Sequence, residues 1–385
     1  AKLATLAVML GLVGADPEKL DRRSLEDHLS GRWYAGNKTL ERVREIVLKA
    51  LANPSVDASA RTTANTFRRW LPVYMDANWR SLRGPLQAEL VDPWEQHLLE
   101  LGVEFHKESP VREIRMTADR AGRGSSRPTA RVRELLVGGP GDATRRLDAS
   151  GAAVVLAVPP QVLHDLADWD EIVPPAVDPA GRRKGVEKPD PGTAIREVTY
   201  LEAAPMAALD LYLSELPLVG DELQGFPEAH FSLVGSQYAI TGFAASEVWR
   251  DEYRESLPPG ANHLVQFVCS DVGTLVGLDE ADALELLRAE IGRFIPELGP
   301  AKRNEDGGDG TATASEPADP VVEAVLLMNS EPEEQVTRNE AGTWEKRPSA
   351  DVGFTNAWLA GDYCRCPVDV ASMEAAVSSG LLAAD

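Results

Sequence analysis

The sequence contains few cysteines, no long apolar run and no excess of basic charge. Its 385 residues include three cysteines, Cys269, Cys364 and Cys366. An odd and sparse set of thiols provides no disulfide framework, which favours a reducing, cytoplasmic environment. The chain also lacks an apolar stretch of about eighteen residues, so no transmembrane helix is expected.

The charge balance is strongly acidic and excludes one large class of partners. The 39 basic and 61 acidic side chains give a formal net charge of −22. An acidic surface repels phosphate backbones, so nucleic-acid binding is not expected. The same repulsion opposes broad adhesion to an anionic membrane, and peripheral membrane contact would require a local apolar patch. We interpret the charge as a solubility adaptation.

Several motifs that mark particular chemistries are absent. No G-x-G-x-x-G, P-loop, H-E-x-x-H or G-x-S-x-G occurs, so the sequence offers no pyrophosphate cradle, zinc-protease helix or hydrolase elbow. The six histidines are scattered, and we interpret them as structural or surface residues. Cys364 and Cys366 form a C-x-C without a second pair of ligands, so packing is expected there and no metal site.

The first eighty residues predict mainly helices. Ser24 is a candidate N-cap, and apolar residues recur with helical spacing over 40–51. Helices are also expected over 66–74 and, as a buried apolar segment and not a signal peptide, over 3–13. A further helix over 86–101 carries its leucines and a tryptophan on one face.

Beyond that helix the pattern changes to short strand-like runs. The Val-rich residues 152–158 are typical of a central strand buried on both faces, and Pro159–Pro160 ends it before a helix. Residues 279–298 predict a long helix, and the Gly-, Asp- and Thr-rich residues 301–319 predict a flexible surface insert. The other expected strands are Val103–His106, Ser109–Met116, Val132–Val137, Ala207–Leu213, Phe231–Val234, Tyr238–Phe243 and His263–Ser270.

The C-terminal residues are the most informative part of the sequence. An apolar strand over Thr355–Ala360 is expected to end at Gly361–Asp362, and a helix rich in small residues is expected over Ala371–Ala384. A helix N-terminus offers free backbone N–H groups and the positive end of a dipole. Such a strand, turn and helix would suit an anionic or electron-rich ligand.

This segment resembles the C-terminal FAD signature of the flavin amine oxidase superfamily. Residues Asn356–Tyr363 read NAWLAGDY, and residues Ala371–Gly380 read ASMEAAVSSG. The sequence of these two stretches is most similar to that of plant- and cyanobacterial-type phytoene and carotene desaturases. Residues 98–114 resemble the family segment that runs under the adenine, and residues 154–160 resemble the strand and double proline that lead to the substrate domain.

The resemblance implies which residues contact FAD. Gly361 and Asp362 are expected at the phosphate or ribityl chain, and the backbone of Val111 at the adenine. Met373 is expected near the pyrimidine edge of the flavin, where the last helix begins. The expected cofactor-binding residues are Val111, Pro159, Gly361, Asp362, Tyr363, Ser372, Met373 and Ala376. No catalytic side chain is assigned.

The resemblance begins inside the family's chain, because the first FAD motif and its ribose-binding acid have no counterpart in this sequence. Two consequences are expected as alternatives. A preceding segment, a second chain or a homo-oligomer supplies these parts, or the chain is a non-catalytic, partner-dependent fragment that does not bind FAD alone.

The expected reaction depends on one absent side chain. Amine oxidases of the superfamily commonly place a lysine near the flavin on a strand of the substrate sheet. The matching residues 205–213 contain no lysine, which disfavours amine oxidation. We therefore expect an FAD-dependent oxidoreductase that dehydrogenates an apolar, isoprenoid or carotenoid-like substrate. A squalene-type dehydroxylase or an oxidase of another small molecule, amines included, is the alternative.

The expected fold class is α/β. It combines an incomplete dinucleotide-binding, Rossmann-like FAD lobe with an α+β substrate lobe that contains an antiparallel sheet. The FAD lobe is expected over residues 81–165 and 350–385. The substrate lobe is expected over residues 1–80, as helices, and over 166–349.

Overall fold

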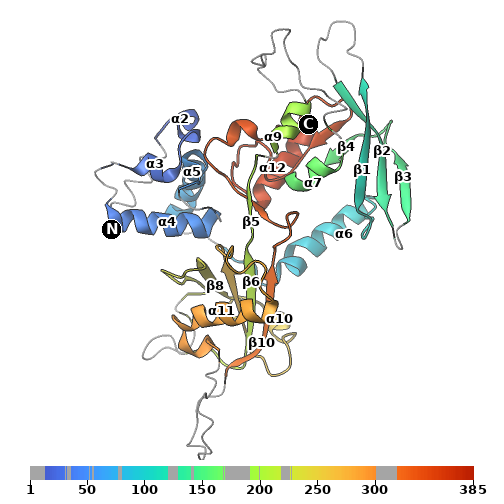
Figure 1. Cartoon of the computed structure of the whole chain (residues 1–385). Helices are drawn as coiled ribbons and strands as arrows, with labels where there is room; N and C mark the ends of the chain where they lie inside the picture. The colour runs from blue at the N-terminus through green and yellow to red at the C-terminus, as the bar shows by residue number, and fades with distance from the viewer. Residues whose placement is uncertain are drawn as a thin grey trace, which may run out of the picture. The chain divides into compact units, whose positions relative to one another are not determined.

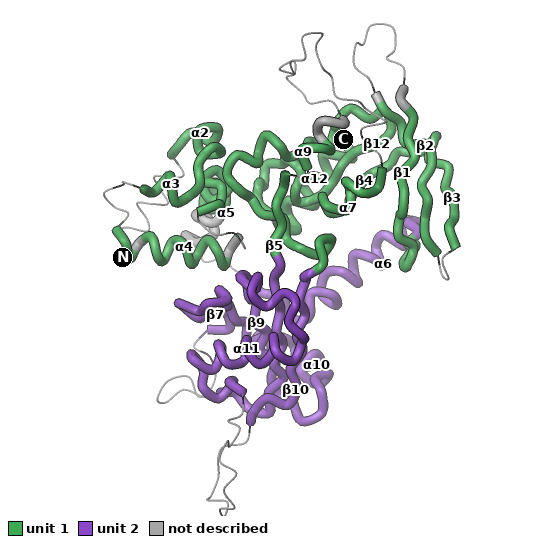
Figure 2. The backbone as a smooth tube through the Cα atoms, viewed as in Figure 1, with its two compact units in different colours: residues 1–77, 105–204, 331–385 green, residues 78–104, 205–330 purple. Residues whose placement is uncertain are grey.

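A computed structural model of the chain shows two compact units (Figure 1, Figure 2). The first comprises Ala1–Ala77, Phe105–Ala204 and Glu331–Asp385, and the second comprises Asn78–Glu104 and Pro205–Ser330. The described residues are 14–30, 32, 36–51, 53, 56–76, 80–119, 129–139, 143–167, 169, 191–198, 200–217, 226, 228–300 and 319–385. The helix expected over 3–13 and residues 301–318 of the expected insert lie outside them.

The first unit begins with helices whose ends are fixed by the local sequence. The Asp27 backbone N–H donates to Ser24 Oγ at 3.1 Å, which confirms the expected N-cap. Leucines of the two short helices pack with apolar residues of the two longer ones, and together they bury a small core. The helices are α2 (Pro17–Asp21), α3 (Leu25–Leu29), α4 (Asn37–Leu51) and α5 (Ala60–Asp76).

The first unit contains two sheets that Asn356 connects. One is an antiparallel sheet of three consecutive strands, and the other is a parallel pair that joins an early strand to the C-terminal one. The strands are β1 (Val111–Asp119), β2 (Thr129–Gly138), β3 (Thr144–Asp148), β4 (Val154–Leu156) and β12 (Ala357–Leu359). The smaller elements around them are α7 (Pro160–Asp165), α9 (Pro191–Val198), β5 (Ala203–Ala204), β11 (Val336–Thr337) and α12 (Met373–Ala384).

Asn356 fastens the two sheets to each other through its buried amide. Its Nδ2 donates to the carbonyl oxygens of Val132 at 3.0 Å, Ala149 at 3.2 Å and Ala152 at 3.1 Å. Its Oδ1 accepts from the Val132 N–H at 2.9 Å. The side chain is 6% exposed, and its bonds therefore satisfy backbone groups that water does not reach.

The second unit is built on a five-stranded antiparallel sheet. Residues of its strand Ala207–Leu213 alternate between buried and half-buried because successive side chains point to opposite faces. The buried face packs against the apolar side of α11 (Glu280–Gly292). In sheet order the strands are β10 (Val321–Met328), β6 (Ala207–Leu213), β9 (His263–Cys269), β8 (Ile240–Ala244) and β7 (His230–Ser232). The unit also contains the π-helical η1 (Gln87–Val91), α6 (Asp92–Glu100) and α10 (Asp251–Arg254).

Three sequence-based expectations are wrong in detail. Residues 103–106 form no strand, because no described strand pairs with them and both Val103 and Phe105 stay exposed. The strand expected over 152–158 shortens to β4, and Val155 in its centre is 50% exposed, so the strand is not buried on both faces. The helix expected over 279–298 ends at Gly292, because Pro296 cannot continue it and starts a 3₁₀ turn instead.

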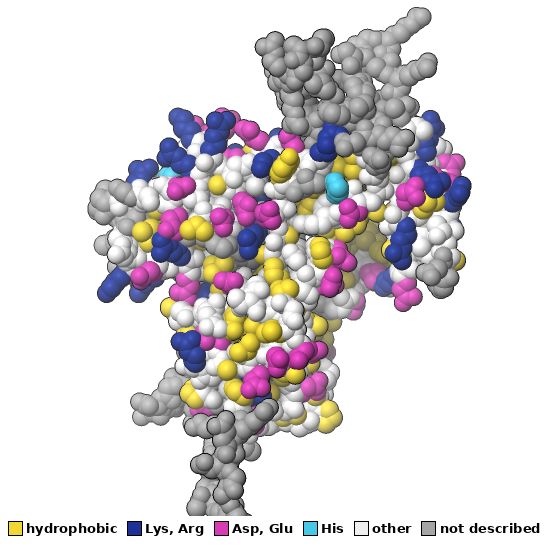
Figure 3. Space-filling view, viewed as in Figure 1, with side chains coloured by type: hydrophobic (Ala, Val, Ile, Leu, Met, Phe, Trp, Pro, Cys, Tyr) yellow, Lys and Arg dark blue, Asp and Glu magenta, His cyan; other side chains and the backbone are white. Residues whose placement is uncertain are grey.

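The other expected strands and helices of the described residues are present, with small differences at their ends. The sequence did not predict β3 or β10. The apolar face expected over 86–101 is also unusual, because no residue of η1 or α6 is buried. None of the described helices is long and apolar enough to cross a membrane. On the face shown in Figure 3, acidic and basic side chains are interspersed.

Asn356→Ala is expected to lower the free energy of unfolding of the first unit by about 3 kcal/mol, because buried backbone groups lose their partners. Urea unfolding followed by circular dichroism measures the change. Asn262→Ala removes an exposed amide that makes one bond, to the Ser214 carbonyl oxygen, and should cost under about 0.5 kcal/mol. Equal losses in the two variants would contradict the proposed role of Asn356.

Candidate functional site

The parallel pair β4 and β12 brings two of the expected cofactor-binding segments to one edge. Val154 lies opposite Ala357, and Leu156 opposite Leu359. Pro159 follows the end of β4 as the residue before α7, and Gly361–Asp362 follows the end of β12. In parallel sheets, ligands bind where the carboxyl ends of neighbouring strands meet. The edge beyond β4 and β12 is therefore a candidate ligand site.

Gly361 turns the chain in a way that only glycine tolerates well. Its φ is +155°, and a Cβ at this position would lie 2.4 Å from Cε1 of the Tyr363 ring. The Gly361 N–H donates to Ser379 Oγ at 2.9 Å, while that hydroxyl lies 2.8 Å from the Gly361 carbonyl oxygen. Ser379 is fully buried on α12, so its hydroxyl clamps the turn onto the helix that follows.

Residues 360–372 form the connector between β12 and α12. The turn at Gly361 lies at its beginning, and the first turn of α12 follows its end. Ser372 caps the helix by accepting a hydrogen bond from the Ala375 N–H at 3.2 Å. Ala375, Ser379 and Ala383 form the buried side of the helix. Met373 is 57% exposed, and Ala376 is exposed as well. The helix therefore presents an apolar side chain beside the backbone N–H groups that its first turn leaves free.

Asp362 is a carboxyl group in an unfavourable place. Burial raises the pKa of Asp362 above its ordinary value, although the positive charge of Arg347 acts to lower it. Tyr363 is 1% exposed, and its hydroxyl has no hydrogen-bond partner among the described residues. Burial raises the pKa of Tyr363 well above its ordinary value, so the phenol stays protonated.

Asp369, in the middle of the connector, is bound by side chains of α5 and by Arg347. Its Oδ2 accepts from Arg61 Nε at 3.1 Å and from Asn65 Nδ2 at 2.9 Å. Its Oδ1 accepts from Thr62 Oγ1 at 3.3 Å and lies 3.6 Å from Arg347 Nη1. Asp369 is 2% exposed and has a φ of +51°, so a fixed and buried carboxylate holds the connector in place.

The two cysteines of the connector contribute to its packing. Cys364 and Cys366 are buried and not joined by a disulfide. Burial raises the pKa of Cys364 to about 12, which keeps its thiol protonated and unreactive. Cys366 Sγ contacts the Ala375 carbonyl oxygen at 3.7 Å. These contacts support the expected packing role.

The residues at this edge suit a flavin. Gly361 leaves space where any side chain would clash, and the free N–H groups at the start of α12 favour negative charge on a reduced ring. The exposed thioether of Met373 offers an apolar surface beside them. Val111 lies elsewhere, at the start of β1 opposite Val137, and no described contact joins it to the edge. Its expected place at the adenine stays a prediction.

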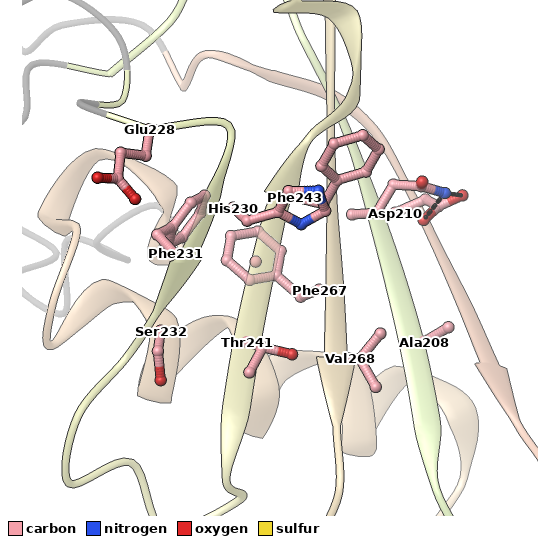
Figure 4. Close-up of a pocket in the computed structure, with 12 residues that line it drawn as sticks. Ala208, Asp210, Glu228, His230, Phe231, Ser232, Thr241, Phe243, Phe267 and Val268 are labelled. Carbon is pink, nitrogen blue, oxygen red and sulfur yellow. Dashed lines mark hydrogen bonds between the residues drawn. The ribbon is translucent and has the colours of Figure 1, made fainter. Parts of the chain in front are cut away.

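A pocket of about 700 Å³ lies on the sheet of the second unit (Figure 4). The strand register places Asp210, Gln266, Phe243 and His230 in one row across four strands. Gln266 Nε2 donates to Asp210 Oδ1 at 3.1 Å and Oδ2 at 3.3 Å, drawn as dashed lines in Figure 4. Burial raises the pKa of Asp210. The adjacent row is formed by Ala208, Val268, Thr241 and Ser232.

His230 lies at the opposite end from Asp210 of the row formed by Asp210, Gln266, Phe243 and His230. Its ring stacks on Phe243 with 4.4 Å between centroids, and its Nε2 lies 2.7 Å from Ser81 Oγ. Phe231 covers Gly242 so closely that a Cβ there would lie 2.2 Å from the phenyl ring. The stacked rings of His230 and Phe243 therefore form a fixed aromatic wall of the pocket.

Sequence analysis missed several side chains that shape these two sites. Asp369 and Arg347 carried no motif, and only their occurrence between recognised segments could have drawn attention to them. Asp210 is the one charged residue of the apolar strand β6, a signal that could have identified it, whereas its partner Gln266 can be identified only from the strand register.

Asp362→Asn is expected to raise the thermal midpoint of the flavin-free chain at about pH 7. Because the folded-state pKa is raised, the ionised carboxylate destabilises the fold once the pH exceeds the ordinary carboxyl range. The advantage of the variant should vanish below about pH 4, where both side chains are neutral. Thermal melts across this range test it, with the exposed Asp251→Asn as the neutral control. A lower midpoint for Asp362→Asn at about pH 7 would contradict the expectation.

Comparison with known proteins places the chain in a family. Residues 40–385 match the family model of flavin containing amine oxidoreductases. An oxidoreductase from Methanosarcina mazei has a similar structure, with 16% identity, coverage of 94% of this chain and 67% of that one, and a TM-score of 0.55. Cyclohexylamine oxidase from Brevibacterium oxydans is similar with 11% identity, coverage of 100% and 72%, and a TM-score of 0.54. No curated protein sequence matches. The chain belongs to the flavin-containing amine oxidoreductases and is an FAD-dependent oxidoreductase.

Proposed function

We propose that this oxidoreductase dehydrogenates an apolar, isoprenoid or carotenoid-like substrate. The observation that carries the flavin part of the proposal is the C-terminal turn, where β12 ends at Gly361–Asp362 and α12 begins after Ser372. When bound, the flavin supplies the oxidant and accepts a hydride at its N5. The chain's own residues then have to hold the cofactor, hold the substrate and exclude water.

The geometry of the edge supports the proposed cofactor contacts. Pro159, Gly361 and Asp362 stand beyond the carboxyl ends of two paired parallel strands, a position at which parallel sheets bind ligands. Ser372, Met373 and Ala376 stand in or next to the first turn of α12. Tyr363 is fully buried under the turn, so its proposed role is to shape the turn from below. A direct contact with FAD is not proposed for it.

The substrate proposal rests on the sheet of the second unit. The strand expected to carry a lysine in amine oxidases, β6, contains none. The pocket on this sheet is lined partly by apolar side chains, among them Ala208, Phe243 and Val268. These residues favour an apolar substrate body, and pockets of this volume accommodate ligands of drug-like size.

An amine is the second candidate substrate, favoured by a specific observation. The titratable residues that line the sheet pocket are Asp210, Glu228 and His230, and its described lining contains no lysine or arginine. An acidic pocket with an aromatic wall attracts organic cations. The absence of a lysine on β6 argues against this alternative.

Anaerobic reduction of bound flavin separates the two candidates. The FAD-loaded protein is mixed with phytoene in detergent, or with cyclohexylamine, and the visible absorption of the flavin is recorded. We expect phytoene to bleach the flavin and cyclohexylamine to leave it oxidised. Bleaching by cyclohexylamine alone would replace the isoprenoid proposal with amine oxidation. No bleaching by either compound, with dithionite still able to reduce the flavin, would contradict both proposed substrate classes.

A further inference from the structure

The middle of the sheet pocket contains a polar pair that an apolar hydrocarbon would leave unused. Asp210 and Gln266 face each other on adjacent strands and are each partly buried. Apolar side chains flank them on both strands, Ala208 on β6 and Val268 on β9. A buried polar pair costs free energy when a hydrocarbon displaces its water. The pair would therefore disfavour the very substrate that the rest of the pocket accommodates.

The hydrogen-bonding capacity of the pair has a definite pattern. One nitrogen of Gln266 approaches both oxygens of Asp210, at 3.1 Å and 3.3 Å, which is the geometry of one shared N–H. An amide nitrogen carries two hydrogens, and a carboxylate has further lone pairs on each oxygen. The pair therefore retains one donor and several acceptor positions next to each other.

A hydroxyl group matches this pattern because it donates one hydrogen bond and accepts others. An ammonium group only donates, so it would leave the second Gln266 N–H without an acceptor. A hydrocarbon does neither. Burial raises the pKa of Asp210, and no described lysine or arginine lines the pocket to neutralise its charge. A hydroxyl donor would compensate the carboxylate without a second charge having to be desolvated.

We propose that Asp210 and Gln266 bind the hydroxyl group of an otherwise apolar alcohol, so that the site prefers an isoprenoid alcohol to the corresponding hydrocarbon. This assignment rests on the proposed oxidation of an isoprenoid in this pocket. The hydroxyl fixes one end of the molecule at the β6–β9 pair. The apolar body then extends over Val268 and along the aromatic wall formed by Phe243 and His230.

Retinol binding tests the proposal without requiring turnover. Three probes share one polyene. They are retinol, retinylamine, and the hydrocarbon in which a hydrogen atom replaces the hydroxyl group of retinol. Dissociation constants are measured by probe fluorescence with the full chain in the presence of FAD. The variants are Asp210→Leu and Gln266→Leu, and Glu323→Leu removes an exposed carboxylate of β10 outside the pocket lining as the control. Circular dichroism checks that each variant is folded.

We expect the wild type and Glu323→Leu to bind retinol about 10- to 100-fold more tightly than the hydrocarbon, as one charged hydrogen bond allows. Asp210→Leu and Gln266→Leu should bind the two probes within about threefold of each other. A loss of folding would weaken all probes alike, whereas the proposal predicts a loss of discrimination.

Three other binding patterns would contradict the alcohol assignment. Equal binding of retinol and hydrocarbon by the wild type would overturn the alcohol assignment and leave the isoprenoid proposal intact. Tightest binding of retinylamine would show recognition of a cation and overturn the assignment in favour of amines. Failure of all three polyenes to bind would overturn the isoprenoid proposal itself, and the alcohol assignment with it.

Discussion

The arrangement of the candidate ligand site beyond β4 and β12 depends on one buried ion pair, between Arg347 and Asp369. Arg347 is 1% exposed, and burial lowers its pKa even though Asp369, Asp362 and Asp21 all act to raise it. A buried charge of this kind is tolerated only when an opposite charge and hydrogen bonds compensate it. Arg347 Nη2 also donates to Asn339 Oδ1. The connector must therefore place Asp369 next to Arg347, and this requirement fixes the path of the chain between β12 and α12.

Side chains of two helices hold the connector along this path. At one end, Ser379 of α12 clamps Gly361 through its hydroxyl. In the middle, α5 holds Asp369 through Arg61, and Arg61 also lies 3.9 Å from the centroid of the Trp344 ring. The early helix α5 and the C-terminal helix α12 thus both stabilise the connector. The cost of burying Asp362 at this edge is paid by the rest of the fold, a pattern typical of functional sites.

The sequence predicted those features that depend on local pattern. Ser24 as an N-cap and the strand over 207–213 follow from side-chain chemistry within a few residues, and both are present. The turn at Gly361 was recognised because the sequence around it resembles a family signature. Features that depend on distant partners were not predictable. The strand expected at 103–106 has no partner, and the pairing of Asp210 with Gln266 exists only through the register of β6 and β9.

If the turn at Gly361 forms part of the flavin site, FAD binding should depend on this glycine, and an FAD titration measures that dependence. Quenching of flavin fluorescence is followed for the wild type, for Gly361→Val and for Gly151→Val, a glycine with open space around it. Far-UV circular dichroism confirms that all three are folded. We expect saturable quenching by the wild type and by Gly151→Val, and none by Gly361→Val. Identical titration curves for the wild type and Gly361→Val, with or without binding, would show that the turn at Gly361 is not part of a flavin site.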